Sequence, residues 1–539
     1  MKGSVLKKFL CTCLVTAAAF AATTISASAC TTIYVGGDLV EEGTPFVART
    51  EDYGSDYNKL WFISESGKWK QGDHYVGCPA YGPFEWDFTH DSYRFTYFTN
   101  DIYYDGTCPE CGKKADHYSY TEFGTNEKGV SVSATETPHG NEKVTEADPY
   151  RDAEWAEANK SERIGIEETD IPTIILAEAS SAREGVKLLL DIYENYGCVA
   201  ASGVFVCDKD ELNDNMIFLE PNMAVIGRVD LDDENVIASK DLIAVAKKAG
   251  TFVGDEAKNI IDFRASYARI SEKMDQRMID GLNYLNATYK YDSDALVADN
   301  TKFTISNLDA SDKLVALYTN IKADRKLDKD DVFGYYKLSS IGKASNQEIE
   351  IFQLFKDRPV ETATVGWVGV GNMSYNVFVP YYPMLIDGMY KGYQVSTASA
   401  KFTTEKPDTF CTYGTSWAQD AEGNWQRVSG FKAYPSNWKD SYYFTFEGLG
   451  GYIANAEKIT GAPLKAEAKT YVADKLAALQ QELYEDFVTT DELAKASDAR
   501  ALATENGKAM AEKAHKLGVE LVEYITKDDA LEPGHFTDV

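Results

Sequence analysis

The start of the chain constrains the rest most, because it reads as an export signal followed at once by a β-strand. Three lysines within the first eight residues precede a mostly small or apolar run over residues 9–25, and the triplet Ala-Ser-Ala follows at 27–29. A basic start, an apolar centre and a small-residue triplet are the parts of a cleavable secretory signal. The run is shorter than the ~20 residues that a membrane-spanning helix usually needs. We therefore expect residues 1–29 to be a signal peptide.

Cleavage after residue 29 would place Cys30 at a new N-terminus, where one residue carries both a thiol and a free α-amine. A cysteine thiol has a pKa near ~8.5 and is only slightly ionised at neutral pH, whereas the thiolate is the reactive form. An α-amine has a pKa of about 7.7–8.0 and is partly a free base at the same pH. The amine can take the thiol proton directly or through one water, so no histidine is required. The sequence predicts an N-terminal cysteine nucleophile.

A lipid anchor is the rival interpretation of the same cysteine, because a cysteine after small residues is also an acylation site. A lipobox prefers leucine three residues before the cysteine, where this chain has Ala27. A flexible tether normally follows a lipidated cysteine, but a strand pattern begins here at Thr31. Acylation would also remove the amine as a base. The alternative from another functional class is thus a lipid-anchored binding protein with a degenerate hydrolase fold.

The charge of the chain excludes one class of partner. The formal net charge is −31, and loss of the three signal-peptide lysines would bring it to about −34. A surface this acidic repels phosphate backbones, so nucleic acid is not an expected partner. No later stretch is apolar and long enough to span a bilayer, and we expect no integral membrane segment in the mature chain. The chain has no P-loop or G-x-S-x-G motif, and we expect no cofactor.

Strand patterns place two further polar residues beside the cysteine. Residues 31–35 are β-branched or aromatic, a Gly-Gly-Asp turn follows, and a second strand pattern covers 45–50. A hairpin of these strands would bring Arg49 and Asp52 back to Cys30. The arginine would favour the thiolate, and the aspartate could orient the amine. A plain surface ion pair is the alternative interpretation of the two charges.

The remaining patterns indicate an α+β fold. Helical spacing predicts helices over 172–197 and 255–285, strand patterns cover 365–380, and the Ala-, Lys-, Glu- and Leu-rich stretch from 461 to 525 predicts two or three amphipathic helices. Strands and helices occur without a regular βαβ rhythm, which favours a layered sheet core.

Several blocks resemble one family. Cys-Thr-Thr-Ile at 30–33, followed nineteen residues on by Arg-Thr-Glu-Asp at 49–52, resembles the PepD-type dipeptidases. These are cysteine peptidases of the N-terminal-nucleophile superfamily, related to choloylglycine hydrolases, penicillin V acylases and acid ceramidases. Further matching blocks lie at 125–130, 134–137, 165–167 together with 170–172, 182–185, 346–353 and 376–382.

The resemblance implies an αββα sandwich with a helical C-terminal extension, and hydrolysis of an amide through a thioester on Cys30. It implies a hydrolase domain with insertions over 30–455 and a helical region over 456–539 packed on the same domain. Arg49 and Asp52 would lie beside the nucleophile. The substrate would be a dipeptide or another small amide, and an N-acyl amide hydrolase is the alternative within the superfamily.

The resemblance also suggests residues for the oxyanion or the substrate. Asn126, Thr135 and Glu136 lie in the blocks that resemble Asn-Glu-x-Gly-Val and Ala-Thr-Glu segments. Related hydrolases place an oxyanion-donating Asn after a strand, and the corresponding segment at 236–240 has Ser239 where Ala-Asn is expected. Ser239, a backbone N–H or another side chain would then donate. Loss of one such donor can cost ~10²–10³ in rate.

The cysteines fit an exported protein with one special thiol. Of nine cysteines, two leave with the signal and seven remain, so at least one stays unpaired if the others pair. Cys108 and Cys111 form a CxxC that supplies two ligands, whereas a structural zinc needs four. Cys78 or a nearby histidine would have to complete such a site, and a disulfide or free thiols are equally open. We expect a secreted, extracellular protein; cell-surface association and a homo-oligomer are left open.

Overall fold

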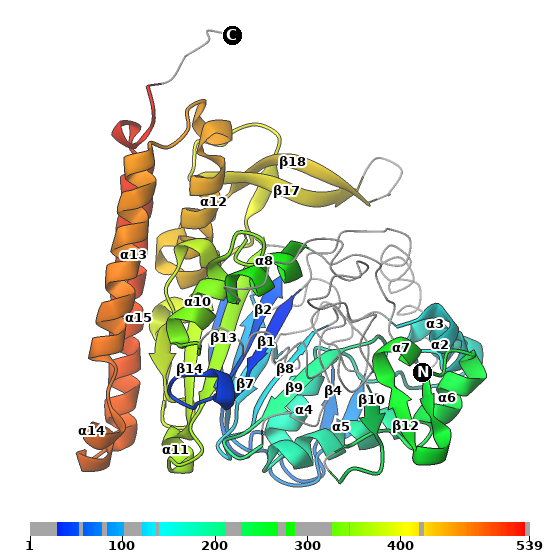
Figure 1. Cartoon of the computed structure of the whole chain (residues 1–539). Helices are drawn as coiled ribbons and strands as arrows, with labels where there is room; N and C mark the ends of the chain where they lie inside the picture. The colour runs from blue at the N-terminus through cyan, green and yellow to red at the C-terminus, as the bar shows by residue number, and fades with distance from the viewer. Residues whose placement is uncertain are drawn as a thin grey trace.

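The computed structural model describes residues 30–52, 58–77, 84–101, 121–135, 140–211, 228–234, 236–267, 276–285, 326–343, 345–419 and 425–533. The expected signal peptide, together with Cys78, Cys108, Cys111 and Glu136, lies outside these residues. Figure 1 follows the chain from blue to red.

A five-stranded antiparallel sheet carries the start of the folded chain. Its strands, in spatial order, are β1 (Thr31–Val35), β2 (Phe46–Asp52), β13 (Asn346–Leu354), β14 (Thr364–Val370) and β15 (Val379–Tyr381). The expected hairpin is β1 paired with β2, in a register that sets Thr32 opposite Arg49. Strand β2 also pairs with β13, so it is central in the sheet and buried along its whole length.

A second sheet faces the first. Its strands are β7 (Phe123–Thr125), β8 (Ser131–Thr135) and β9 (Gly203–Cys207). One face of this sheet is apolar, with Val132, Ala134 and Val206 among its residues, and it packs on the helices α4 (Ile171–Glu178) and α5 (Ala182–Tyr196). The hydrophobic residues of α5 recur at helical spacing, and Ser181 caps its N-terminus by accepting from the Glu184 N–H.

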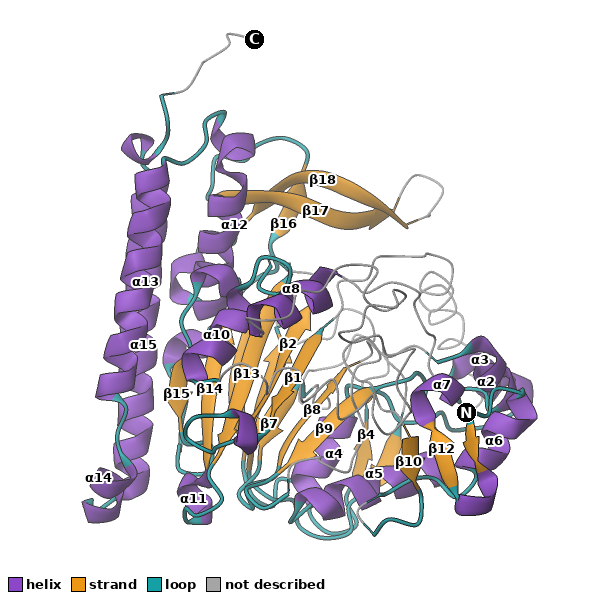
Figure 2. Ribbon diagram, in the orientation of Figure 1, coloured by secondary structure: helices purple, strands orange, loops and turns teal. Residues whose placement is uncertain are grey.

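Aromatic residues join the two sheets. The rings of Phe205 on β9 and Phe352 on β13 meet edge to face with centroids 6.0 Å apart, as is favourable for buried rings. On the opposite face of the five-stranded sheet, Ile349 and Ile351 pack with Phe333 of α10 (Lys329–Lys337). The order of layers is therefore α10, five-stranded sheet, three-stranded sheet, then α4 and α5, as Figure 2 shows.

Smaller elements surround these layers. They are β3 (Lys59–Ser64) paired with β6 (Phe95–Asn100), β4 (His74–Val76) with β5 (Glu85–Asp87), β10 (Arg228–Asp230) with β12 (Ile260–Asp262) and β11 (Gly254–Asp255), and β16 (Lys401–Thr403) with β18 (Trp425–Ala433) and β17 (Cys411–Gln419). The remaining helices of this part are α2 (Glu142–Ala147), α3 (Ala153–Asn159), α6 (Leu242–Ala249), α7 (Phe263–Tyr267), α8 (Gln276–Leu285) and α11 (Val360–Ala363).

Helices dominate the C-terminal part, as the composition predicts. They are α12 (Tyr442–Thr460), α13 (Ala466–Asp486), α14 (Thr490–Lys495) and α15 (Ala499–Ile525). Leu449, Leu476 and Leu521 of these helices belong to the same hydrophobic cluster as Val368 of β14. The expected boundary at residue 455 falls inside α12, at Asn455, where the backbone leaves helical geometry. Among the described residues, no helix is both long and apolar enough to cross a membrane.

Two expectations about elements need correction. The helix predicted over 255–285 is wrong at its start, because Ile260 and Ile261 form β12, after a turn in which Asn259 has a φ of 51°. β-Branched residues suit a strand better than a helix. The strand predicted over 365–380 is two strands, since Gly371 turns the chain at a φ of +94° that favours glycine.

We predict that Phe352→Ala lowers the free energy of unfolding by about 3–5 kcal/mol, because it leaves a cavity between the two sheets. Leu502→Ala is the control, since Leu502 is 38% exposed on α15 and its loss should matter far less. Urea denaturation followed by circular dichroism measures both. Equal losses in the two variants would show that the inter-sheet contact is not a main source of stability.

Candidate active site

Cys30 and Arg49 are brought together by the β1–β2 hairpin. Cys30 immediately precedes β1 and is only 7% exposed. The Nη2 atom of Arg49 lies 3.2 Å from the Cys30 Sγ atom and donates to it. Strand register explains the contact, because Thr32 lies opposite Arg49 and Thr31 opposite Thr50. The Thr31 N–H also donates to the Thr50 hydroxyl at 2.8 Å, which fixes the chain next to the cysteine.

The Arg49 guanidinium is the centre of a buried charge cluster. Its side chain is 2% exposed and contacts Glu51 directly. It lies 3.1 Å from a carboxylate oxygen of Glu168 and 3.8 Å from one of Glu122. Its Nη1 atom donates to the Ser133 hydroxyl of β8 at 3.1 Å, and so connects the two sheets. One cation thus serves the thiol and three carboxylates.

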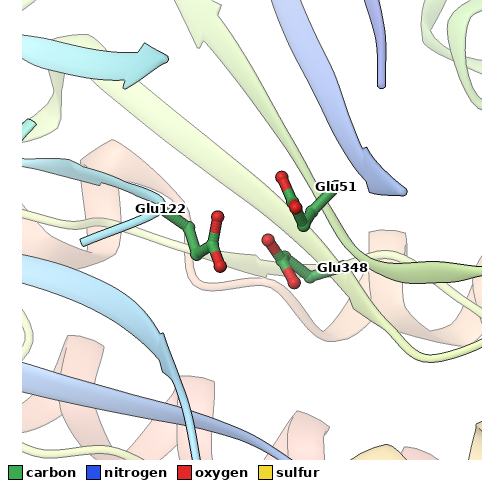
Figure 3. Close-up of side chains that lie close together, drawn as sticks. All are labelled: Glu51, Glu122 and Glu348. Carbon is green, nitrogen blue, oxygen red and sulfur yellow. The ribbon is translucent and has the colours of Figure 1, made fainter. Parts of the chain in front are cut away.

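A second buried cation continues this cluster. Lys59 on β3 contacts Glu122 and lies 3.2 Å from Glu348 of β13. The carboxylates of Glu51, Glu122 and Glu348 converge, with oxygens within 4.8 Å of one another (Figure 3). Burial, followed by the nearby Glu51 charge, raises the pKa of Glu122 to about 7. Carboxylate oxygens suit hard cations, but here Lys59 and Arg49 already lie against them, so the cluster carries its own counter-charges.

Asp52 lies at the end of β2 with cations of its own. Its carboxylate is fully buried and lies 3.1 Å from the Lys343 ammonium and 3.8 Å from the Arg277 guanidinium. The side-chain amide of Asn346 donates to it as well. Burial raises the pKa of Asp52, and Lys343 opposes that shift. The negative charge of Asp52 is close enough to raise the pKa of Cys30.

Two residues far along the chain hold the Cys30 backbone. Arg277 of α8 donates through Nη1 to the Cys30 carbonyl at 3.2 Å and to the Thr31 hydroxyl at 3.1 Å. The Tyr336 hydroxyl of α10 contacts the carbonyl oxygens of Thr31 at 3.2 Å and Ala48 at 2.8 Å. No sequence signal pointed to either residue, because each is more than 240 positions from the cysteine. These contacts fix the nucleophile from its backbone side.

The surroundings of Cys30 favour the neutral thiol over the thiolate. Burial raises its pKa well above the ordinary value, and Arg49 lowers it less than burial raises it. The charges of Glu51, Glu168 and Asp52 each raise it further. A neutral thiol is a poor nucleophile. The Cys30 Sγ atom donates to a carboxylate oxygen of Glu51 at 3.5 Å, and the arginine beside the sulfur does not by itself ionise the thiol.

The side-chain amide of Asn126 stabilises a turn by hydrogen bonds. Its Nδ2 atom donates to the carbonyls of Leu176 at 3.0 Å and Ala179 at 2.8 Å. Its Oδ1 atom accepts from the N–H groups of Lys128 and Val130, both at 3.0 Å. The amide is fully buried and ties the β7–β8 turn to α4. The structure thus gives this candidate a scaffold role.

The other two described candidates lie in different places. Thr135 ends β8 and shares a strand face with Ser133, whose hydroxyl contacts Arg49. Ser239 lies in the loop before α6, and its neighbour Lys240 pairs with Glu194 of α5 at 3.2 Å. Figure 1 shows α6 at the right-hand edge of the molecule, whereas β1 and β2 lie near its centre. The structure does not bring Ser239 to the Cys30 hairpin.

The described cysteines other than the nucleophile carry no bridge. Cys198, Cys207 and Cys411 are free thiols, as is Cys30. The candidate metal or disulfide residues Cys78, Cys108 and Cys111 lie outside the described residues, as does Glu136.

We predict that Arg49→Met lowers the free energy of unfolding by about 3–5 kcal/mol, because it leaves buried carboxylates without their shared cation. Adding Glu51→Gln should recover part of that loss, which makes the two changes non-additive. Lys513→Met is the control, since Lys513 also pairs with two carboxylates but is 42% exposed and such pairs contribute little. Urea denaturation of Arg49→Met, Glu51→Gln, the double variant and Lys513→Met measures the coupling. A loss in Arg49→Met no larger than in Lys513→Met would contradict the shared-cation account.

Comparisons with known proteins identify the family of the chain. A model of peptidase family C69 matches residues 29–415. The probable dipeptidase B of Streptococcus pyogenes serotype M1 is 28% identical over 398 residues, covering 68% of this chain and 74% of that protein. The probable dipeptidase B of Lactococcus lactis subsp. lactis is 24% identical over 486 residues, covering 82% and 94%.

Among solved structures, a penicillin V acylase from Agrobacterium tumefaciens matches 66% of this chain and 87% of its own, at 12% identity and a TM-score of 0.29. A score this low carries no argument about the fold. The family model, in contrast, spans well over half of the sequence. The chain therefore belongs to peptidase family C69.

Proposed function

We propose that this protein is a secreted cysteine dipeptidase whose nucleophile is the thiol of Cys30, exposed by removal of the leader. The observation that carries the proposal is the contact between the Arg49 Nη2 atom and the Cys30 Sγ atom at 3.2 Å. It places a permanent cation on the sulfur that would become an N-terminal thiol. Membership of a peptidase family, with relatives named dipeptidases, supports the substrate class.

The α-amine released by cleavage supplies the base. The amine takes the thiol proton, and the Sγ atom bonds to the carbonyl carbon of the scissile amide. The proton then goes to the leaving nitrogen, the C–N bond breaks, and the first amino acid stays on Cys30 as a thioester. Water attacks the thioester, releases the amino acid and restores the thiol. Arg49 stabilises the negative charge on sulfur in both steps.

The layered fold supports an αββα sandwich of the N-terminal-nucleophile type. Helix α10 packs outside the five-stranded sheet, and α4 and α5 pack outside the three-stranded sheet. The proposed nucleophile immediately precedes β1 of the first sheet, and its sulfur contacts Arg49, which also reaches Ser133 on the facing sheet.

We predict that the chain starting at Cys30 reacts faster with iodoacetamide than the full-length chain at pH 8. The leader-bearing thiol has a pKa raised well above its ordinary value by burial, so few molecules are ionised at that pH. In the processed chain the rate should rise with pH through the α-amine pKa of about 7.7–8.0. Peptide mapping by mass spectrometry measures alkylation at Cys30. Equal rates in the two chains would exclude the amine as the base.

The mature N-terminus separates the proposal from its rival. We predict that mass spectrometry of the exported protein finds an unmodified N-terminal Cys30. A diacylglyceryl adduct on that residue would instead establish the lipid-anchored binding protein, because the thioether occupies the Cys30 sulfur and leaves no thiol to attack a substrate.

We predict that Cys30→Ser lowers dipeptide hydrolysis at least about 10³-fold, as loss of a catalytic nucleophile usually does. Cys198→Ala is the matched control, because Cys198 is a free thiol in the bridge to Ile166 and has no role in the mechanism. Release of free amino acid from a panel of dipeptides measures both variants. Full activity in Cys30→Ser would disprove the thioester mechanism.

A further inference from the structure

Carboxylates crowd the surroundings of the Cys30 sulfur. Arg49, the cation on the sulfur, contacts three of them, those of Glu51, Glu122 and Glu168, and Lys59 is a second cation that pairs with Glu122. Two of these charges, together with burial, raise the pKa of the thiol and so oppose its ionisation. A carboxylate that opposes ionisation of the thiol can have a second role in binding. A substrate with a positively charged group would be a partner for it.

A dipeptide carries such a charge next to the bond that is cut. Its α-nitrogen and scissile carbonyl carbon are attached to the same Cα atom, so they lie roughly 2.5 Å apart by standard bond lengths. In a reactive complex the carbonyl carbon lies about 3–3.5 Å from the attacking sulfur. The ammonium group is therefore held within about 6 Å of the Cys30 Sγ atom. An N-acyl amide has no charge at this position.

Among the three carboxylates, Glu168 is the one placed to meet this ammonium group. Its Oε1 atom lies 3.1 Å from the Arg49 Nη2 atom, which is itself 3.2 Å from the sulfur. Its side chain is 15% exposed, against 8% for Glu51 and 1% for Glu122. Glu168 lies in the turn before α4, so it approaches the site from the three-stranded sheet's side rather than from β2. Glu168 is thus both close to the sulfur and partly exposed to solvent.

We propose that Glu168 binds the α-ammonium group of the dipeptide and so restricts the enzyme to substrates with a free amine beside the scissile amide. A charge-assisted hydrogen bond between carboxylate and ammonium is among the stronger polar contacts in proteins. Glu168 already accepts from the Arg49 Nη2 atom at 3.1 Å, and a carboxylate has further acceptor positions for an ammonium group that an acylated substrate would not fill. The inference rests on the proposed dipeptidase function and names the residue that would separate dipeptides from N-acyl amides.

The bound ammonium would also act on the nucleophile. The negative charge of Glu168 raises the pKa of Cys30, and a positive group paired with that carboxylate offsets its effect on the thiol. Substrate binding would then favour the thiolate at the moment it is needed.

The test compares two substrates that differ only at the amine. One is the dipeptide that the wild-type protein cleaves fastest, and the other is its desamino analogue, in which hydrogen replaces the α-amine. The ratio of their kcat/KM values measures recognition of the ammonium group. Glu168→Gln should lower this ratio at least 10-fold, chiefly through a higher KM for the dipeptide. Glu167→Gln, the same substitution one residue earlier, is the matched control and should leave the ratio unchanged.

The substrate pair distinguishes recognition from a general electrostatic effect. If Glu168 acts only through the charges on Arg49 and Cys30, Glu168→Gln changes kcat/KM for both substrates alike, and an unchanged ratio overturns the inference. Loss of all activity in wild type on every dipeptide would instead overturn the proposed function.

A measurement on the wild-type protein covers the case in which Glu168→Gln fails to fold. The α-amine of a dipeptide loses its proton near pH 8, at a pKa of about 7.7–8.0. The KM of the dipeptide should therefore rise about 10-fold per pH unit above this value, while the KM of the desamino analogue should not follow it. Parallel profiles for the two substrates would contradict ammonium binding at the site.

Discussion

The sharing of one buried guanidinium among a thiol and several carboxylates is the interaction on which the rest of this site depends. Arg49 lies on the interior strand β2, contacts the Cys30 sulfur beside its own sheet, and reaches Ser133 on the facing sheet. Burying an arginine is expensive unless its hydrogen-bonding groups are satisfied by charged partners. Glu51 and Glu168 both pair with the Nη2 atom and hold it against the sulfur.

The same arrangement explains why an arginine alone does not make the thiol reactive. The carboxylates that make a buried Arg49 tolerable also raise the pKa of Cys30, and burial raises it further. The site is thus organised around the sulfur before it is active. In the proposed function, an α-amine that forms only when the chain is cut before Cys30 supplies the base, which would couple activity to export. Glu168, the most exposed of the carboxylates around Arg49, would then also pair with the charge that a dipeptide carries.

The hairpin is the part of the site that sequence reasoning could predict. Strand patterns and a short turn placed Arg49 opposite the start of β1, and the pairing register confirms that placement. The burial of Glu348 and Glu350 was harder to predict. They alternate with Ile349 and Ile351 on β13, and such alternation normally indicates that one face of the strand is exposed to solvent. Here both faces are buried. A charged face between two sheets looks like a surface in a single sequence.

Contacts across long sequence distances were not predictable. Arg277 and Lys343 reach Asp52 from segments whose patterns indicated no more than a helix or a loop. Glu168 sits between the two halves of a recognised block, yet only its 3.1 Å contact with Arg49 singles it out. For Asn126 the sequence predicted too much. A block match suggested that it binds the oxyanion or the substrate, whereas its amide stabilises a turn. Side-chain roles depend on three-dimensional neighbours that local patterns do not contain.

The most direct measurement is a titration of the processed protein with iodoacetamide, in which residual dipeptide hydrolysis is plotted against the fraction of Cys30 alkylated. If the Cys30 thiol is the nucleophile, activity falls in proportion to alkylation and reaches zero when Cys30 is fully modified. Activity that survives complete alkylation of Cys30 would contradict the account.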